Sequence, residues 1–95
     1  MAVLTTSERA AALATLSGWT FDAERNGIAK TFKFGGFGEA FAFMTRVALE
    51  AEKADHHPEW TNVWNRVDVL LSTHSEGGVT EKDIALAGEM EKIAG

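Results

Sequence analysis

The chain has 95 residues, 45% of them hydrophobic, with a formal net charge of −5 at pH 7 and no cysteine. This length and composition predict a single globular domain, 1–95, rather than a disordered tail. The absence of cysteine excludes disulfides, thiolate metal sites and cysteine nucleophiles, and the acidic balance disfavours binding to nucleic acid, which needs clustered Lys and Arg.

The N-terminal residues up to Trp19 include no basic segment followed by a long apolar run. We therefore expect neither a signal peptide nor a membrane span, and together with the missing cysteines this favours a cytoplasmic protein. Within the same segment, Thr5 and Glu8 have the spacing of a capping box. They predict a short Ala-rich helix over about 5–16, which ends before Gly18.

Two runs rich in aromatic and β-branched residues follow, at 19–22 and 27–34. The Asn26-Gly27 pair between them favours a tight turn, so the two runs predict a β-hairpin. Alternation within the second run places one set of side chains on a common face: Ile28, Lys30, Phe32 and Phe34.

The segment 37–55 has helical character, with Glu39 near its first turn to suit the helix dipole. Its apolar residues form two rows, of which the first contains Phe37, Phe41, Met44, Ala48 and Ala51. The second row contains Ala40, Phe43, Val47 and Ala54. Two rows are broader than one sheet-facing surface needs, so we expect a second partner, another subunit, against this helix.

Two further strand-like runs, 60–64 and 66–73, are joined near Asn65. The second run should direct alternate side chains to the core: Val67, Val69, Leu71 and Thr73. Thr80 and Asp83 then form another capping box before a last helix, whose apolar residues are Ile84, Leu86, Ala87, Met90 and Ile93. The order α-β-β-α-β-β-α predicts an α+β fold, a four-stranded antiparallel sheet with three helices packed on one face.

All three histidines, His56, His57 and His74, lie within nineteen residues. Imidazole has an unperturbed pKa of about 6.5, which suits proton transfer near neutral pH. Pro58 disfavours helical geometry in the residue before it, so the adjacent pair should lie on an ordered bend after the helix. Their rings can diverge and His74 can approach from another direction, so three imidazoles could surround one pocket. The alternative, given even weight, is that all three are solvated surface groups drawn by the helix dipole.

A zinc site is a further alternative, because the histidines with Glu52, Asp55 or Glu59 could fill a coordination sphere. Two consecutive histidines rarely bind one ion, and no His-x-x-x-His pair occurs, so the spacing favours a site without metal. Glu52 lies one turn before His56 and could orient that ring or raise its pKa, or could be an ordinary solvated carboxylate.

The tryptophans Trp19, Trp60 and Trp64 are of a residue type usually found in a core or interface. Trp60 lies close behind two histidines and could instead stack on a flat heterocycle. Asp83 has a structural explanation as the partner of the Thr80 cap.

The segments around the histidines resemble the signature of the pterin-4a-carbinolamine dehydratase family, on Asp55-His56-His57-Pro58-Glu59-Trp60, Asn62-Val63-Trp64-Asn65 and Leu71-Ser72-Thr73-His74. The similarity extends back to Gly18-Trp19 and forward to Asp83-Ile84. It implies the same α-β-β-α-β-β-α fold, with homodimers or homotetramers formed through sheet edges and the 37–55 helix.

The resemblance also implies a reaction, the removal of water from a 4a-hydroxytetrahydropterin to give a quinonoid dihydropterin after aromatic amino acid hydroxylation. It implies no cofactor and no metal, because the pterin is the substrate. His56 and His57 would be the acid and base candidates, with His74 polarising the hydroxyl or holding the ring. The substrate site would be lined by these histidines and by Asp55, Pro58, Trp60, Ser72, Thr73 and Ser75, and supported by Glu52, Asp83 and Trp19.

Some members of this family also act as dimerisation cofactors of a homeodomain transcription factor, which provides a second functional hypothesis. The acidic and compact chain suits a metabolic enzyme better. The sequence departs from the family pattern at Gly36, where relatives often have an Asp helix cap, and at Thr61 and Trp64. Gly36 should loosen the helix N-terminus modestly, because glycine has no side-chain acceptor.

Overall fold

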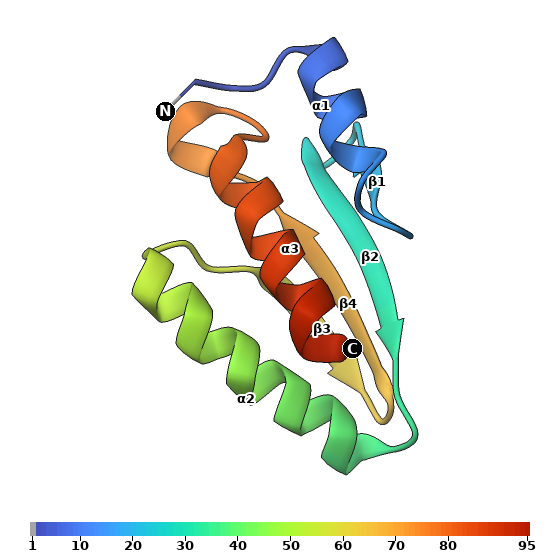
Figure 1. The fold of residues 1–95 in the computed structure, drawn as a ribbon. Helices are drawn as coiled ribbons and strands as arrows, with labels where there is room; N and C mark the ends of the chain where they lie inside the picture. The colour runs from blue at the N-terminus through green and yellow to red at the C-terminus, as the bar shows by residue number, and fades with distance from the viewer. Residues whose placement is uncertain (1) are drawn as a thin grey trace.

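The computed structural model describes residues 2–95 and contains three α-helices and four strands (Figure 1). In chain order these are α1 (Thr6–Leu13), β1 (Thr20–Asp22), β2 (Gly27–Lys33), α2 (Phe37–Ala54), β3 (Glu59–Val63), β4 (Arg66–Leu71) and α3 (Glu81–Ala94). A short 3-10 helix, η1 (His74–Glu76), lies between β4 and α3 and was not predicted. The predicted order α-β-β-α-β-β-α is confirmed.

The four strands form one antiparallel sheet in the order β1-β2-β4-β3. The register places Ile28 opposite Leu71 and Phe32 opposite Val67 in the central pair. The helices lie on one side of this sheet, with α2 and α3 across its length and α1 near β1 (Figure 1). The α+β prediction is therefore confirmed.

The core lies between the sheet and the helices. Alternate residues of β4 face it, because side chains of a strand point to opposite faces in turn. As predicted, Val67, Val69, Leu71 and Thr73 are buried, together with Ile28 and Phe32 from β2 and Leu86, Ala87 and Met90 from α3. Lys30 shares the core-facing side of β2, where its ammonium contacts Glu91 of α3 at 2.7 Å.

Both predicted capping boxes are present, at Thr5 with Glu8 and at Thr80 with Asp83. The first helix is shorter than the predicted 5–16, because α1 ends at Leu13. After it the backbone makes bonds from residue i to i−3, and the Thr15 hydroxyl also donates to the Ala12 carbonyl at 2.7 Å. The helix therefore tightens into 3-10-type bonds before the chain reaches Gly18, whose φ of 82° lies in the left-handed region.

The β1–β2 turn has Asn26 in the left-handed region, with φ of 53°, followed by Gly27 in a crowded position. A Cβ on Gly27 would lie 2.7 Å from the Leu71 carbonyl oxygen and 2.8 Å from a methyl carbon of Leu70.

Since the oxygen belongs to the backbone of the sheet, we expect Gly27→Ala to lower the free energy of unfolding by about 1–3 kcal/mol. Urea unfolding measures this. Gly88→Ala is the control, because its Cβ would meet no atom within 4 Å; equal effects at both positions would contradict the prediction.

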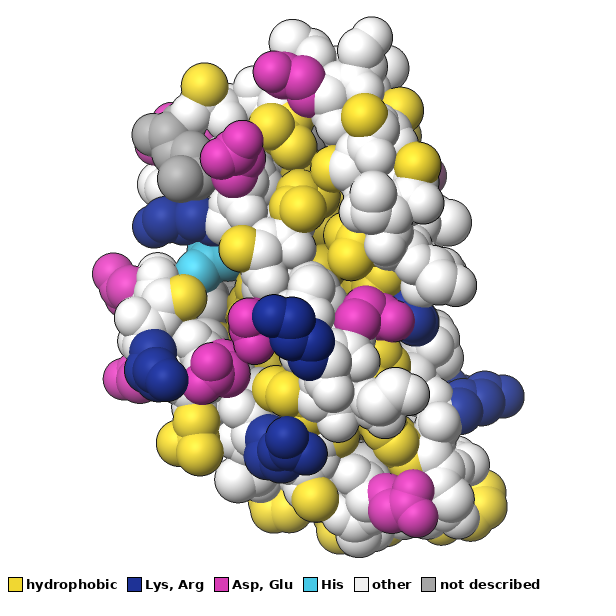
Figure 2. Space-filling model, in the orientation of Figure 1, with side chains coloured by type: hydrophobic (Ala, Val, Ile, Leu, Met, Phe, Trp, Pro, Cys, Tyr) yellow, Lys and Arg dark blue, Asp and Glu magenta, His cyan; other side chains and the backbone are white. Residues whose placement is uncertain are grey.

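Helix α2 buries one apolar row and exposes much of the other. The buried residues are Ala40, Phe43, Val47 and Ala51, so Ala51 belongs to the core row rather than to the row predicted for it. Phe37 and Phe41 are 52% and 57% exposed, with ring centroids 5.6 Å apart. Hydrophobic side chains reach the surface near α2 at the lower edge of the molecule (Figure 2). A subunit partner for this exposed row stays a prediction.

Asp68 lies on the face of the sheet that the helices leave uncovered. The Thr31 hydroxyl donates a hydrogen bond to Asp68 at 2.6 Å, and the Arg66 guanidinium lies beside the same carboxyl. These two groups hold the pKa of Asp68 below its usual value of 3.8, because their effect exceeds that of partial desolvation, which raises the pKa. A lowered folded-state pKa adds stability above pH 3.8, which is lost as the pH falls through the folded value.

We expect Thr31→Val to raise the pKa of Asp68 toward 3.8, measured by NMR titration of its carboxyl carbon. Thr45→Val on α2 serves as the control, and an unchanged Asp68 pKa in Thr31→Val would contradict the prediction.

Candidate active site

The bend between α2 and β3 positions the two adjacent histidines. Asp55 ends α2 in the left-handed conformation, with φ of 52°, and the His56 amide donates to the Ala51 carbonyl at 3.1 Å. The chain then passes through Pro58 into β3, where helical geometry is disfavoured for the preceding residue. The predicted ordered bend is confirmed, and it fixes the directions in which the two rings leave the chain.

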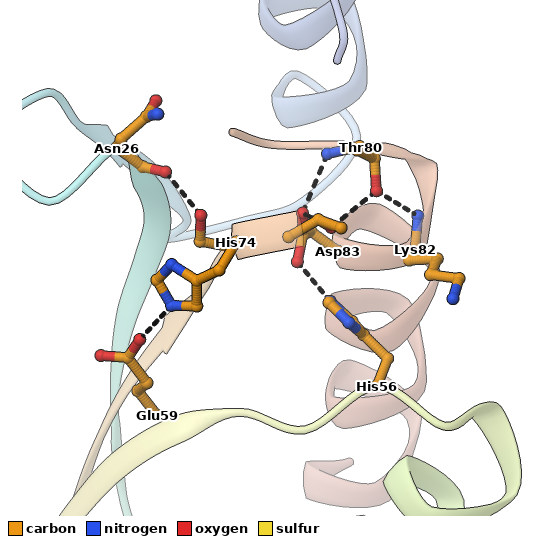
Figure 3. A network of polar contacts seen from close by, with 9 residues as sticks. Asn26, His56, Glu59, His74, Thr80, Lys82 and Asp83 are labelled. Carbon is orange, nitrogen blue, oxygen red and sulfur yellow. Dashed lines mark hydrogen bonds and ion pairs between the residues drawn. The ribbon is translucent and has the colours of Figure 1, made fainter. Parts of the chain in front are cut away.

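His56 points into the molecule, where its side chain meets the fully buried Asp83 of α3 (Figure 3). His56 is only 8% exposed, and its Nε2 lies 2.5 Å from Oδ1 of Asp83. The other carboxyl oxygen, Oδ2, accepts bonds from the Thr80 amide at 2.9 Å and from the Thr73 hydroxyl at 2.8 Å. Asp83 thus completes the capping box of Thr80, as the sequence predicted, and is also the partner of a histidine.

The second ring nitrogen of His56 has a different environment. Within residues 2–95, no buried side-chain nitrogen or oxygen lacks a hydrogen-bond partner. Nδ1 of His56 makes no hydrogen bond in that part of the chain, so this nitrogen must reach the surface. One edge of the ring is therefore held by a buried carboxylate, whereas the nitrogen of the other edge keeps some contact with solvent.

His57 points away from His56, toward the surface of α2. Its Nε2 lies 2.9 Å from Oε1 of Glu52, and the two side chains are 58% and 80% exposed. The predicted divergence of the adjacent rings is confirmed. The interpretation that Glu52 orients His56 is wrong, because the helix geometry brings its carboxylate to His57 instead.

His74 begins η1 rather than ending a strand, and its Nε2 lies 2.6 Å from Oε1 of Glu59 at the start of β3 (Figure 3). Both side chains are mostly exposed, at 72% and 58%. Thr73, the residue before His74, donates a hydrogen bond to Asp83, and His56 contacts the same carboxylate. Asp83 therefore connects His56 to the segment that carries His74. Sequence reasoning considered Glu59 only as a metal ligand, since nothing in the sequence pairs it with a residue fifteen positions away.

The other predicted site residues have mixed surroundings. The hydroxyl of Ser72 donates to the Asn26 carbonyl at 2.8 Å, and Ser75 is exposed on η1. The indole of Trp19 donates to Glu91 at 2.9 Å within the core. Asp55 is exposed, whereas Pro58 and Trp60 are half-buried beside β3. Their contacts with a substrate stay predictions.

A hollow of about 780 Å³ opens on the uncovered face of the sheet, and its lining includes Thr31, Glu59, Trp60 and Asp68. It adjoins the histidine region only through Glu59 and Trp60.

Among residues 2–95, no three His, Asp or Glu side chains are grouped as ligands for a metal ion. In the same part of the chain, no helix combines the length and apolar character needed to cross a membrane.

Comparison with known proteins decides the family. The sequence model described as pterin 4 alpha carbinolamine dehydratase matches residues 2–93. This chain belongs to that family. A protein of Rhizorhabdus wittichii named "Putative pterin-4-alpha-carbinolamine dehydratase" is 57% identical over 91 residues, covering 96% of this chain and 94% of its own length. A protein of the same name from Rhodopseudomonas palustris is 58% identical over 92 residues, covering 97% and 91%.

A solved structure shows the same fold. The crystal structure of the transcriptional coactivator/pterin dehydratase from Brucella melitensis matches with a TM-score of 0.95 and 56% identity. The match covers 98% of this chain and 99% of that chain. The family resemblance inferred from the histidine segments is thus confirmed over nearly the whole length.

Proposed function

We propose that this protein removes water from a 4a-hydroxytetrahydropterin and releases a quinonoid dihydropterin. Membership of the family supports the substrate class. The observation that carries the proposal is the pair formed by His56 and the fully buried Asp83, in which Nε2 of His56 lies 2.5 Å from Oδ1 of the carboxylate. Each of the three imidazoles has a carboxylate partner, which suits side chains that gain and lose protons during a reaction.

The proposed elimination needs two proton transfers. The bond between C4a and the hydroxyl oxygen breaks, and this oxygen takes up a proton to leave as water. N5 loses its proton, and the electron pair that remains forms the C4a–N5 double bond. General acid and base groups of this kind typically accelerate a reaction by about 10²- to 10⁴-fold. The reaction needs no external oxidant and therefore no redox cofactor, and we propose that it also proceeds without a metal.

In this proposal His56 and His57 supply the acid and the base, and His74 polarises the hydroxyl or holds the ring. Asp83, Glu52 and Glu59 would hold the three imidazoles, as their contacts suggest. The exposed row of α2 and the sheet edges would join subunits into homodimers or homotetramers. We place the reaction in the cytoplasm, after aromatic amino acid hydroxylation.

The test is a stopped-flow ultraviolet assay of 4a-hydroxytetrahydropterin dehydration, run on the wild type and on His56→Ala, His57→Ala and His74→Ala. Circular dichroism establishes that each variant compared is folded. We expect the wild type to accelerate dehydration and the variants to lose most of this acceleration. A wild type no faster than buffer would refute the proposal. Full activity after treatment with a chelator would refute the zinc alternative.

A second candidate function is a non-catalytic role as the dimerisation cofactor of a transcription regulator. One observation favours it, because the Brucella melitensis relative is called a transcriptional coactivator as well as a pterin dehydratase. The exposed Phe37 and Phe41 on α2 would supply a binding surface. A pull-down that recovers a regulator in stoichiometric amount would support this role, whereas a stable homotetramer with nothing attached would argue against it.

A further inference from the structure

The hydrogen bonds around Asp83 have directions that the backbone sets. An amide nitrogen can only donate, so the Lys82 amide donates to the Thr80 hydroxyl oxygen at 3.2 Å. For the same reason the Thr80 amide donates to Oδ2 of Asp83. All of these groups except Lys82 are buried, so solvent does not supply alternative partners.

The two threonine hydroxyls continue these directions. The Thr73 hydroxyl donates its only hydrogen to Oδ2 of Asp83, at 2.8 Å. The 2.7 Å contact between the Thr73 and Thr80 hydroxyls must therefore be a bond from Thr80 to Thr73. Every hydrogen in this chain of bonds points toward the carboxyl group, which favours Asp83 as an ionised acceptor.

We propose that Thr73 and Thr80 are positioning residues that make His56 the base of the reaction and Nδ1 the atom that takes the proton. An ionised Asp83 needs a donor at Oδ1, and the group there is Nε2 of His56, at 2.5 Å. With the hydrogen on Nε2, a neutral His56 has its lone pair on Nδ1, the nitrogen that reaches the surface. Thr73 was predicted to line the substrate site, but its hydroxyl is bound within this network.

The proton transfers then follow for the proposed reaction. The N5 proton moves to Nδ1, and the electron pair of the N5–H bond forms the double bond to C4a. His56 becomes an imidazolium, stabilised by Asp83 through Nε2. The departing hydroxyl takes its proton from a second imidazolium, for which the exposed His57 and His74 are the candidates. His56 regains its neutral form by releasing its proton to solvent, and the histidine that acted as the acid takes up a proton from solvent.

The first measurement is the ¹⁵N chemical shift of each His56 ring nitrogen in the wild type, at a pH where the ring is neutral. We expect a proton on Nε2 and none on Nδ1. A proton on Nδ1 with Nε2 unprotonated would overturn the inference, whatever happens in any variant. The kinetic consequence rests on the proposed function, whereas this measurement does not depend on activity.

The second measurement compares Thr73→Val, which removes the hydroxyl at nearly constant shape, with Thr73→Ser, which keeps it. Without this donor, Oδ2 of Asp83 keeps only the bond from the Thr80 amide, so the network should favour the hydrogen of His56 on Nε2 less strongly. We expect Thr73→Val to lower kcat by about tenfold, a part of the full contribution of a general base, with KM changed much less. Thr73→Ser should restore kcat and the wild-type ring protonation.

A folded Thr73→Val with wild-type kcat and ring protonation would overturn the role of Thr73. If Thr73→Val does not fold, the wild-type ring measurement still decides which nitrogen of His56 carries the hydrogen. A wild type with the expected ring protonation but no dehydration activity would refute the proposed function and leave the hydrogen-bond directions intact.

Discussion

Asp83→Asn is expected to fold and to lose about 10²- to 10⁴-fold in dehydration rate, the range of a general acid or base contribution. The Thr80 amide and the Thr73 hydroxyl both donate to one carboxyl oxygen, so the asparagine oxygen should occupy that place. Its NH₂ group would then face Nε2 of His56 and force this nitrogen to accept. His56 would carry its hydrogen on Nδ1 and could no longer take a proton there. In catalytic triads, the same change costs about 10⁴-fold through the wrong tautomer.

The stability of position 83 provides a second measurement. Asp83→Ala would leave the buried His56 and Thr73 without their partner and would remove the Asp83 half of the capping box of α3. Breaking a buried pair in this way costs about 3–5 kcal/mol, so this variant should unfold at much lower urea than Asp83→Asn. Glu81→Gln is the control, since it removes an exposed carboxylate from the same helical turn. Wild-type kcat in a folded Asp83→Asn would contradict the role assigned to this carboxylate.

His57→Ala is expected to change the free energy of unfolding by less than about 0.5 kcal/mol, as surface substitutions usually do. The His57 side chain is 58% exposed, and its one carboxylate partner, Glu52, is more exposed still. Such solvent-exposed pairs contribute little stability. The dehydration rate should nevertheless fall by about 10²- to 10⁴-fold if His57 supplies a proton in the reaction. Urea unfolding and the stopped-flow assay measure the two effects separately.

The control for His57→Ala is Lys53→Ala, which truncates another exposed side chain near the end of α2. Lys53 is 76% exposed and pairs with Glu50 at 3.3 Å. It should leave both stability and rate close to wild type. Marked destabilisation by His57→Ala would identify the residue as structural, and an unchanged rate in a folded variant would remove it from the reaction.

Together the two substitutions separate two kinds of histidine. His56 is buried and oriented by a network that joins Asp83 of α3 to Thr73 in the segment after β4, whereas His57 is exposed and has only a local partner. A buried base with a fixed tautomer and an exposed acid in contact with solvent suit the two proton transfers of the proposed reaction. The contrast predicts that substitutions around Asp83 affect stability and rate together, while those at His57 affect rate alone.

The sequence by itself determined the parts of this protein that depend on neighbours a few residues apart. Helix and strand periodicity predicted every α-helix and strand, and residues three apart identified both capping boxes. The bend at 55–58 also followed from local chemistry, since proline restricts the residue before it. Local reasoning missed the early end of α1 at Leu13 and the short 3-10 helix η1.

Only the tertiary structure decided what the histidines contact. Asp83 is twenty-seven residues from His56, and Glu59 is fifteen residues from His74, so no sequence spacing could reveal either pair. Packing of α3 against the sheet brings Asp83 under the bend and excludes water from it, which separates the buried His56 from the exposed His57 next to it. Adjacent residues of the same type thus acquire different environments, because burial and partner choice depend on how distant elements pack and not on the local chain.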